Sequence, residues 1–391
     1  MPRNFMAHRV SAFGTTIFSE ITALANQHGA VNLGQGFPDF DGPEEIKQFA
    51  ADAVLKGYNQ YAPSFGIGEL RNAIAEHSER FYSLKVDPAT EITITSGATE
   101  ALFDASFAFI EPGDEVIIFE PCYDSYIPAI EMAGGIVKAV TLHAPDFRFK
   151  KEELRAAFSK KTKVIYVNTP HNPTGTVFLK EELEYIAELC CEFDVLAITD
   201  EVYEHIVFSG AEHFRLATFK GMRDRTLTIS SIGKSFSLTG WKVGWAIGNP
   251  ELQSALRRVH QFATFSTATA FQYASAHALQ MPDEYFSFLK EDFEKRRDFL
   301  YNVLKESGLE PTLPQGNYFI LCNIRNFTYK SGLEFSRFLI EKIGVASIPL
   351  ETMYVHRGYG ESLIRFCFCK KWETLENAAV RLRKLHDSNR F

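Results

Sequence analysis

Long apolar runs, an excess of basic charge and paired cysteines are all missing from this 391-residue sequence. No apolar stretch approaches the roughly 20 residues that span a bilayer. The first ten residues, MPRNFMAHRV, carry basic side chains without an apolar segment behind them, so we expect no secretory signal and no membrane partner. Aspartate and glutamate (49) outnumber lysine and arginine (41), and the formal net charge is −8. This balance argues against a nucleic-acid partner.

The six cysteines lack the spacing of a disulfide framework. Cys190 and Cys191 are adjacent within a helical pattern, Cys367 and Cys369 lie in the strand-like LIRFCFC, and no C-x-x-C occurs. Buried free thiols are therefore favoured over metal ligands, and we expect no metal site. This cysteine usage is typical of a reduced, cytoplasmic protein.

Several common catalytic motifs are also missing. Gly233-Lys234-Ser235 resembles the end of a phosphate-binding P-loop, but Thr228 stands where that motif needs its first glycine. Gly34-Gln35-Gly36 lacks the rest of the dinucleotide-binding G-x-G-x-x-G, and neither G-x-S-x-G nor H-E-x-x-H occurs. The eleven histidines are scattered along the chain. The sequence therefore disfavours nucleotide-binding, nicotinamide-dependent and zinc-dependent enzymes.

From about residue 90, β-rich segments alternate with helical patterns. Strands are expected at 91–96, 115–119, 163–168, 195–199 and 226–230, and apolar spacing predicts an amphipathic helix over 180–193. Nearly all-apolar strands separated by helices indicate an α/β fold, in which helices cover both faces of a mainly parallel sheet.

The pattern changes after residue 280. We expect a long helix over 284–306, strands near 318–324 and 363–368, a helix near 332–343 and a terminal helix. A chain of this length exceeds a single small core. We therefore predict a large domain of residues 45–283 and a smaller α+β domain formed by residues 1–44 and 284–391.

Polar residues follow the predicted strands at the edge where ligands bind in such sheets. Asp200 and Tyr203 follow 195–199, Lys234 follows 226–230, Asn172 follows 163–168, and the segment Gly97-Ala98-Thr99 begins a helix after 91–96. Pyridoxal phosphate requires this combination. It needs a lysine for its aldehyde, a carboxylate for its ring nitrogen, neutral donors for its ring oxygen and a helix N-terminus for its phosphate.

The motifs at these positions resemble the fold-type I, class I/II aminotransferases over the whole chain. SSIGKSFSLTGWKVGW is similar to the lysine signature of that family, and NTPHNPTG, ITDEVY, NLGQGFPDF, GATEAL, EPCYDSY and LIRFCF are similar to further family segments. GQGFPDF, NQYAP, TGWKVGW and VHQ together resemble the branch of kynurenine/glutamine aminotransferases and bacterial methionine aminotransferases. The resemblance implies a seven-stranded sheet in the large domain and a homodimer with its active site at the subunit interface.

The resemblance also implies a role for each residue that matches a family motif. Lys234 would hold the cofactor aldehyde as a Schiff base and later carry the proton, and Asp200 would pair with the ring nitrogen. Asn172 and Tyr203 would contact the ring oxygen, and Tyr123 would stack on the ring. The phosphate would be held by Ala98, Thr99, Ser231, Lys242 and, from the second subunit, Tyr61. At Lys242 the wider family has arginine, so the phosphate geometry differs there.

For the substrate, the resemblance implies that Arg365 clamps the α-carboxylate with help from Asn172 and the backbone at Gly36. Phe18, Tyr61 and Phe265 would line the side-chain pocket. No second arginine lies in a side-chain-binding motif, so dicarboxylates are disfavoured. We expect ping-pong transfer from methionine, an aromatic residue, leucine, histidine, glutamine or kynurenine to a 2-oxo acid.

Two alternatives stay open at this point. The same site could act as a β-lyase on cysteine S-conjugates, or the fold could serve as a non-catalytic binding module. Each residue also has an ordinary structural role, because lysines are mostly solvated, turns use asparagine, and phenylalanines (35 in this chain) mostly form core.

Overall fold

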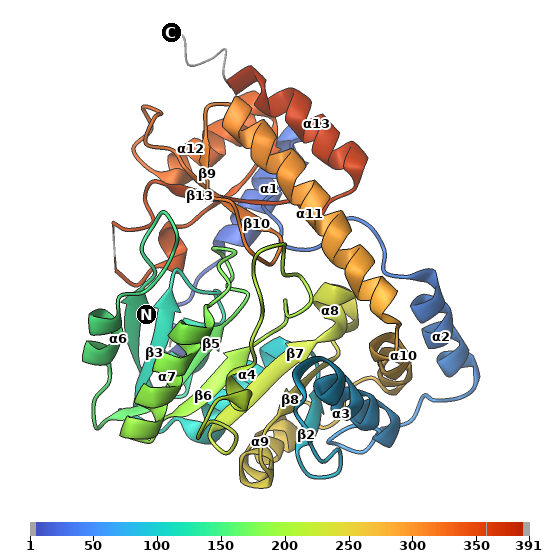
Figure 1. The fold of residues 1–391 in the computed structure, drawn as a ribbon. Coiled ribbons are helices and arrows are strands. Elements are labelled where there is room, and N and C mark those ends of the chain that lie inside the picture. The colour runs from blue at the N-terminus through green and yellow to red at the C-terminus, as the bar shows by residue number, and fades with distance from the viewer. Residues whose placement is uncertain (1–4, 357, 386–391) are drawn as a thin grey trace.

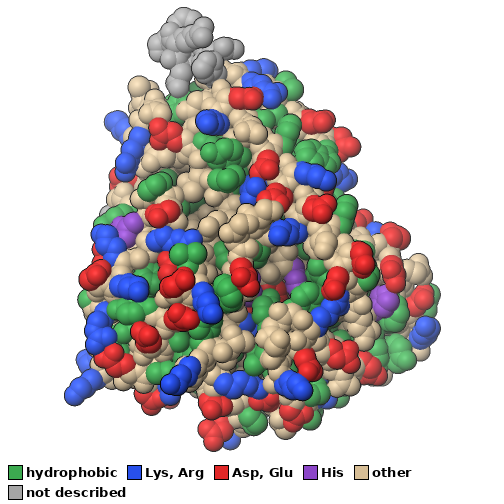
Figure 2. All heavy atoms as spheres, in the orientation of Figure 1, with side chains coloured by type: hydrophobic (Ala, Val, Ile, Leu, Met, Phe, Trp, Pro, Cys, Tyr) green, Lys and Arg blue, Asp and Glu red, His purple; other side chains and the backbone are tan. Residues whose placement is uncertain are grey.

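The computed structural model describes residues 5–356 and 358–385. The start of the chain, on which no secretory signal is expected, therefore lies in part outside the described residues. Among the described helices, none has both the length and the apolar character to cross a membrane. Figure 2 shows acidic and basic side chains interspersed over one face of the molecule.

The main sheet has the strand order β2-β8-β7-β6-β5-β3-β4. Its strands are β2 (Ile92–Thr95), β3 (Glu115–Glu120), β4 (Ile136–Thr141), β5 (Thr162–Asn168), β6 (Leu196–Asp200), β7 (Thr226–Ser231) and β8 (Gly244–Ile247). All pairings are parallel except those of β8, which runs antiparallel to both β2 and β7. The predicted α/β fold with a mainly parallel, seven-stranded sheet is confirmed.

Helices cover both faces of this sheet because side chains alternate along each buried strand. In β5, Ile165 and Val167 pack toward α7 (Lys180–Phe193), whereas Val164 and Tyr166 pack toward α4 (Ala98–Phe109) and α5 (Tyr126–Met132). The first of these faces is also covered by α1 (Ile17–His28) and α6 (Lys151–Ala157), and the second by α9 (Pro250–Ala263).

A third apolar cluster covers the β2–β8 edge of the sheet. Its helices are α2 (Glu44–Leu55), α3 (Gly68–Tyr82) and α10 (Thr269–Leu279). Figure 1 shows these helices on one side of the sheet, with α11 (Asp283–Glu306) running from α10 toward α13 (Trp372–Leu382).

A smaller antiparallel sheet has the order β12-β13-β10-β9. Its strands are β9 (Glu310–Pro311), β10 (Phe319–Asn323), β12 (Ile348–Pro349) and β13 (Leu363–Cys367). The helices α11, α12 (Gly332–Phe338) and α13 pack on it. Near the N-terminus, β1 (Val31–Asn32) pairs in parallel with β11 (Val345–Ala346). The domain boundaries at residues 44/45 and 283/284 stay a prediction.

The cysteines are free, as expected, but one of them is not buried. Cys191 is exposed, whereas Cys122, Cys190, Cys322, Cys367 and Cys369 are buried. The expectation of buried thiols is therefore wrong for Cys191, because successive residues of a helix point to different sides and only Cys190 faces the sheet.

Candidate active site

The ends of the central strands enclose a cavity of about 370 Å³. The carboxyl ends of β2, β3, β5, β6 and β7 meet at this edge, and antiparallel β8 begins there. The cavity is lined by the predicted residues Phe18, Gly36, Ala98, Thr99, Tyr123, Asn172, Asp200, Tyr203, Ser231, Lys234, Lys242 and Arg365. The structure thus brings together every predicted site residue except Tyr61 and Phe265.

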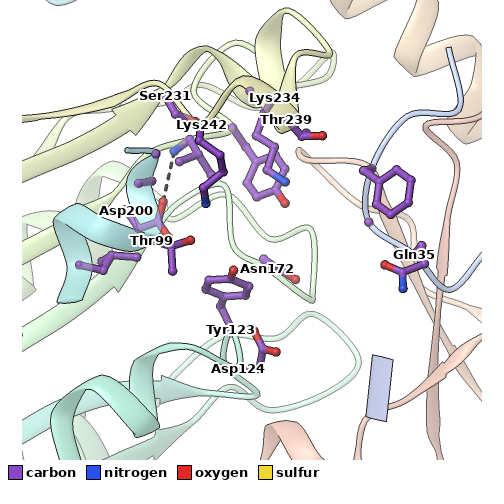
Figure 3. Close-up of a pocket in the computed structure, with 18 of the residues that line it drawn as sticks. Gln35, Thr99, Tyr123, Asp124, Asn172, Asp200, Ser231, Lys234, Thr239 and Lys242 are labelled. Atoms are coloured by element: carbon purple, nitrogen blue, oxygen red, sulfur yellow. Dashed lines mark hydrogen bonds between the residues drawn. The ribbon is translucent and has the colours of Figure 1, made fainter. Parts of the chain in front are cut away.

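Lys234 lies on the short helix α8 (Ile232–Ser235), which follows β7 directly. Figure 3 shows its side chain extending into the cavity. Its Nζ atom lies 5.6 Å from the ring centroids of both Tyr203 and Tyr318. Burial lowers the pKa of Lys234, and the negative charge of Asp200 only partly opposes this effect. A lowered pKa favours the neutral amine, the form that can attack an aldehyde or accept a proton.

Asp200 is the last residue of β6, and only 5% of it is exposed. Its carboxylate accepts hydrogen bonds from the Tyr126 hydroxyl at 2.7 Å and from the Val202 backbone N–H at 3.4 Å. Burial raises the pKa of Asp200 above its usual value. A buried carboxylate that faces a cavity is a suitable partner for a protonated ring nitrogen, which would lower this pKa again.

An ion-pair network behind the cavity fixes the turn that follows Asp200. The buried Arg215 guanidinium lies 2.9 Å from Glu201 and 2.7 Å from Glu204. Glu204 also accepts a hydrogen bond from Ser230 of β7 at 2.6 Å. Glu204 therefore joins the turn that carries Tyr203 to strand β7, which leads to Lys234. Removing one partner of a buried ion pair is strongly destabilising, so this network holds the two segments together.

The loop after β5 places Asn172 in the wall of the same cavity. The backbone N–H of Asn172 donates to Asn168 Oδ1 at 2.7 Å, and Asn168 Nδ2 donates to the Asp200 carbonyl at 2.8 Å. Tyr203 packs edge-on against Tyr318, with ring centroids 5.1 Å apart. These contacts fix Asn172 and Tyr203 relative to Asp200.

The end of the cavity beside α4 has the features of a phosphate site. Gly97 has a φ of +82°, and a Cβ added there would lie 3.1 Å from Lys242 Nζ. At Gly244 a Cβ would lie 2.6 Å from the Ala98 nitrogen, so both glycines are needed for this close approach. The first N–H groups of a helix have no intrahelical acceptor and are free to bind an anion. At the N-terminus of α4 these groups, the Lys242 amine and the hydroxyls of Thr99 and Ser231 line the same part of the cavity and can together bind a phosphate.

Arg365, in the middle of β13, is only 2% exposed yet faces the cavity. Its Nη1 donates to Asn172 Oδ1 at 3.0 Å and its Nη2 donates to the Gly34 carbonyl at 3.2 Å, while its buried Nε has no partner. The guanidinium carbon lies 3.9 Å from the Phe319 ring centroid and 5.3 Å from that of Phe18. Within residues 5–356 and 358–385, no carboxylate forms an ion pair with Arg365.

Tyr61 and Phe265 lie outside this cavity, on the surface. Tyr61 is 83% exposed and Phe265 is 40% exposed, and their rings meet edge-on with centroids 5.2 Å apart. Neither side chain contributes to the site of its own chain. The predicted role of Tyr61 in a second subunit stays a prediction.

Sequence reasoning missed several lining residues, among them Thr16, Gln35, Phe37, Asp124, Thr239 and Phe319. The family segments NLGQGFPDF and EPCYDSY contain Gln35, Phe37 and Asp124. These motifs therefore indicated the right segments but not these individual residues. Phe319 begins the buried strand β10. The apolar pattern of a buried strand does not distinguish an aromatic residue that lines a cavity from one that packs in the core.

The described residues fit pyridoxal phosphate at both of its ends. The glycine-lined helix N-terminus with Lys242 suits the phosphate, and Asp200 and Lys234 suit the ring nitrogen and the aldehyde. Arg365, which also lines the cavity, is not needed to hold the cofactor and can bind a substrate carboxylate.

Comparison with known proteins agrees with this geometry. The family profile described as "Aminotransferase class I and II" matches residues 28–382. The chain is 42% identical over 377 residues to the methionine aminotransferase of Escherichia coli (strain K12), covering 96% of this chain and 97% of the relative. It is 40% identical over 419 residues to the kynurenine–oxoglutarate transaminase of Dictyostelium discoideum, covering 96% and 95%. A solved structure of N-succinyldiaminopimelate aminotransferase from Mycobacterium tuberculosis superposes with a TM-score of 0.95 at 43% identity, covering 97% of this chain and 100% of that one.

Proposed function

Because this chain belongs to the class I and II aminotransferases, which are enzymes that use pyridoxal phosphate, we propose the following activity for it. The enzyme moves the amino group of an L-amino acid with an uncharged side chain to a 2-oxo acid, in two half-reactions that share one site. Methionine, aromatic residues, leucine, histidine, glutamine and kynurenine are the candidate donors. Relatives named for methionine and kynurenine support this choice.

The observation that carries the proposal is the unpaired guanidinium of Arg365. Buried charges in proteins are normally paired with an opposite charge, and among the described residues Arg365 has only neutral acceptors, Asn172 and Gly34. Its planar group can bind both oxygens of a carboxylate at once. Every amino acid donor and every 2-oxo acid acceptor carries such a carboxylate, so a single clamp serves both half-reactions.

In the first half-reaction one proton leaves the α-carbon of the donor, and in the second half-reaction one proton is added to the α-carbon of the acceptor. When bound, pyridoxal phosphate supplies an aldehyde that takes up the amino group and a ring that withdraws the electron pair from the α-carbon. Lys234 Nζ would accept the donor's α-proton and deliver it to the aldehyde carbon of the cofactor, and it would carry a proton the other way in the second half-reaction, because burial lowers its pKa toward the neutral form. Asp200 would keep the ring nitrogen protonated, held in place by the Tyr126 hydroxyl.

The remaining wall of the cavity is aromatic. Phe18, Phe37 and Phe319 line it beside Arg365, together with Gln35. Burial of an uncharged side chain against these rings is favourable at roughly 25 cal/mol per Å² of apolar surface. This wall supports the choice of an uncharged donor, and it leaves the particular amino acid open among those named above.

We further propose that the enzyme is a homodimer in which Tyr61 completes the phosphate site of the partner subunit. Tyr61, Phe262 and Leu55 are 83%, 89% and 83% exposed in the single chain. The Tyr61 ring also meets the exposed Phe265 ring, with centroids 5.2 Å apart, and contiguous exposed apolar surface is typical of a protein interface. The segment that carries Tyr61 is tied to the segment after α9, since Ser266 Oγ donates to the Ala62 carbonyl at 3.1 Å.

Isotope transfer tests the proposed activity. The purified enzyme with pyridoxal phosphate is given ¹⁵N-labelled L-methionine and the 2-oxo acid of phenylalanine, and the amino acid products are analysed by mass spectrometry. We expect ¹⁵N in phenylalanine and initial-rate plots with parallel lines, as two half-reactions at one site require. Free labelled ammonia with no labelled phenylalanine would refute transamination between these substrates, and release of ammonia and pyruvate from a cysteine S-conjugate would support the β-lyase alternative.

A further inference from the structure

Residues 34–40, here called the substrate loop, connect β1 to the segment before α2 and form one wall of the cavity. Three of these residues line the cavity: Gln35, Gly36 and Phe37. Figure 3 shows Gln35 across the cavity from Lys242, which lies at the phosphate end. Because Arg365 Nη2 donates to the Gly34 carbonyl at 3.2 Å, the loop lies directly beside the guanidinium that is proposed to bind the substrate carboxylate.

The first half of the substrate loop is fixed by hydrogen bonds to its backbone. Asn32 Oδ1 accepts the N–H groups of Gly34 at 3.0 Å and Gln35 at 3.1 Å. The Gly36 carbonyl accepts the Tyr318 hydroxyl at 2.7 Å. A Cβ added at Gly36 would lie 3.9 Å from Arg365 Nη2 and 2.7 Å from the Phe319 ring. The Gly36 backbone, which is expected to contact the substrate carboxylate, is therefore placed next to the Arg365 guanidinium.

The second half of the loop is held by a buried lysine. Lys370 follows β13 and is only 3% exposed. Its Nζ donates to the Phe37 carbonyl at 2.8 Å and lies 5.1 Å from the centroid of the Phe37 ring. Buried charges are normally paired with an opposite charge, but among the described residues the acceptor of this amine is a backbone carbonyl. Lys370 thus spends a buried amine on fixing one peptide group of the substrate loop.

The backbone of Lys370 is itself held in place. Arg296 of α11 donates from Nη1 to the Lys370 carbonyl. The Arg296 guanidinium lies between two rings, with its carbon 5.0 Å from the Phe40 centroid and 5.1 Å from the Trp372 centroid. Its Nε donates to Asp292 Oδ2 at 2.7 Å. The anchor of the loop is therefore part of the packed small sheet and its helices.

We infer that Lys370 is a positioning residue that holds the substrate loop beside Arg365, so that the carboxylate of a donor or acceptor meets the Gly36 backbone and the Arg365 guanidinium together. This inference rests on the proposed function, because it assumes that Arg365 binds the α-carboxylate. The same bond fixes Phe37, so the aromatic wall next to the carboxylate site depends on Lys370 as well.

The contact serves the substrate and not the cofactor. None of the residues proposed to hold pyridoxal phosphate belongs to the substrate loop. A loop that is ordered before binding loses little conformational freedom when the substrate arrives. Without the Lys370 bond that ordering would accompany binding and would weaken it equally in the ground state and the transition state, which raises KM and leaves kcat unchanged.

A dead-end ligand tests the inference without turnover. 3-Phenylpropionate has a carboxylate for Arg365 and a ring for the aromatic wall, but no amino or oxo group that could react, so calorimetry on the enzyme with its cofactor gives its affinity directly. In Lys370→Met we expect its dissociation constant and KM for L-methionine to rise about tenfold or more, as for the loss of one hydrogen bond from a charged donor. We expect kcat to fall less than about threefold and the affinity for pyridoxal phosphate to change less than about twofold.

Two further variants at the same position sharpen the test. Lys370→Gln keeps a polar side chain that is one bond too short to reach the Phe37 carbonyl, and we expect it to behave as Lys370→Met does. Lys370→Arg keeps a long charged donor and should recover most of the affinity. The matched control is Lys371→Met, which makes the same change in an exposed side chain outside the cavity and keeps the backbone N–H that donates to Asp39 at 2.5 Å. It is expected to match the wild type.

Unchanged affinity for 3-phenylpropionate in folded Lys370→Met and Lys370→Gln would refute the role of Lys370. A loss of pyridoxal phosphate affinity as large as the loss of ligand affinity would also refute it, because the contact would then support the whole site. If the wild type neither binds 3-phenylpropionate nor transfers nitrogen from methionine, the proposed function itself fails, so the two failures are distinguishable.

Discussion

Replacing Arg365 separates binding of substrate from stability of the fold. Arg365→Met keeps most of the side-chain volume against Phe319 and Phe18 but removes the positive charge and the planar pair of N–H donors. A carboxylate bound by two hydrogen bonds from a guanidinium gains about 1.5–3 kcal/mol from each. Loss of both therefore costs about 3–6 kcal/mol, or about 10²–10⁴-fold in kcat/KM. Arg365→Lys keeps one point contact and should lose about 10–100-fold.

The same substitution should barely destabilise the protein. In the part of the wild-type chain that the structure describes, the buried guanidinium has only the neutral acceptors Asn172 and Gly34, so its removal also removes an uncompensated buried charge. We expect the free energy of unfolding of Arg365→Met to change by less than about 2 kcal/mol, since the lost contacts and the relieved desolvation offset one another. Steady-state kinetics and urea unfolding measure the two quantities. A loss of kcat/KM below tenfold in a folded variant would refute the clamp.

Three further predictions concern Lys234, Tyr61 and His260. Lys234→Ala should lower kcat by at least about 10³–10⁴-fold without lowering the melting temperature, because it removes the group that moves the α-proton; substantial turnover would contradict this role. Tyr61→Phe should weaken pyridoxal phosphate binding by about 10–150-fold, the value of one hydrogen bond to a charged phosphate, although Tyr61 lies outside the cavity of its own chain; unchanged affinity by fluorescence titration would remove it from the partner's site. Burial opposes the charge of His260, but the Asp104 carboxylate 3.7 Å away and the hydrogen bond to Glu100 at 2.9 Å outweigh it and raise its pKa to about 10. The free energy of unfolding of the wild type should therefore exceed that of His260→Gln by its full amount below about pH 6.5. This difference should shrink by at most about 1.4 kcal/mol per pH unit as the pH rises to 10. A difference in urea unfolding that does not change with pH would contradict the prediction.

Most of the fold follows from apolar periodicity. The predicted helix over 180–193 is confirmed as α7 (Lys180–Phe193), and the one over 284–306 is confirmed as α11 (Asp283–Glu306). The individual positions of β4 and β8 were not predicted. Ile136 at the start of β4 is exposed at the sheet edge, which weakens its apolar signal. The first two residues of β8 (GWAI) are the end of the segment SSIGKSFSLTGWKVGW, which indicates chemistry more clearly than a strand.

Within the site, strand ends and motifs together placed Asp200, Lys234 and Arg365 in one cavity. The position of Asp124 could not be derived from its sequence, because a carboxylate in a turn usually points to water. Its exposure to the cavity depends on how Tyr126 and Cys122 anchor the turn, and those contacts join residues far apart in the chain. The role proposed for Tyr61 depends on a second subunit, and no pattern within one chain reveals such a contact.

The most direct test of the central claim is the visible absorption of the purified enzyme with pyridoxal phosphate during alternate additions of substrate. We predict that L-methionine alone removes the absorption of the cofactor bound to Lys234, that a 2-oxo acid alone then restores it, and that the cycle repeats. Lys234→Ala should not show this cycle. An absorption that stays unchanged on adding each of the candidate donors, in folded enzyme that binds the cofactor, would contradict the account.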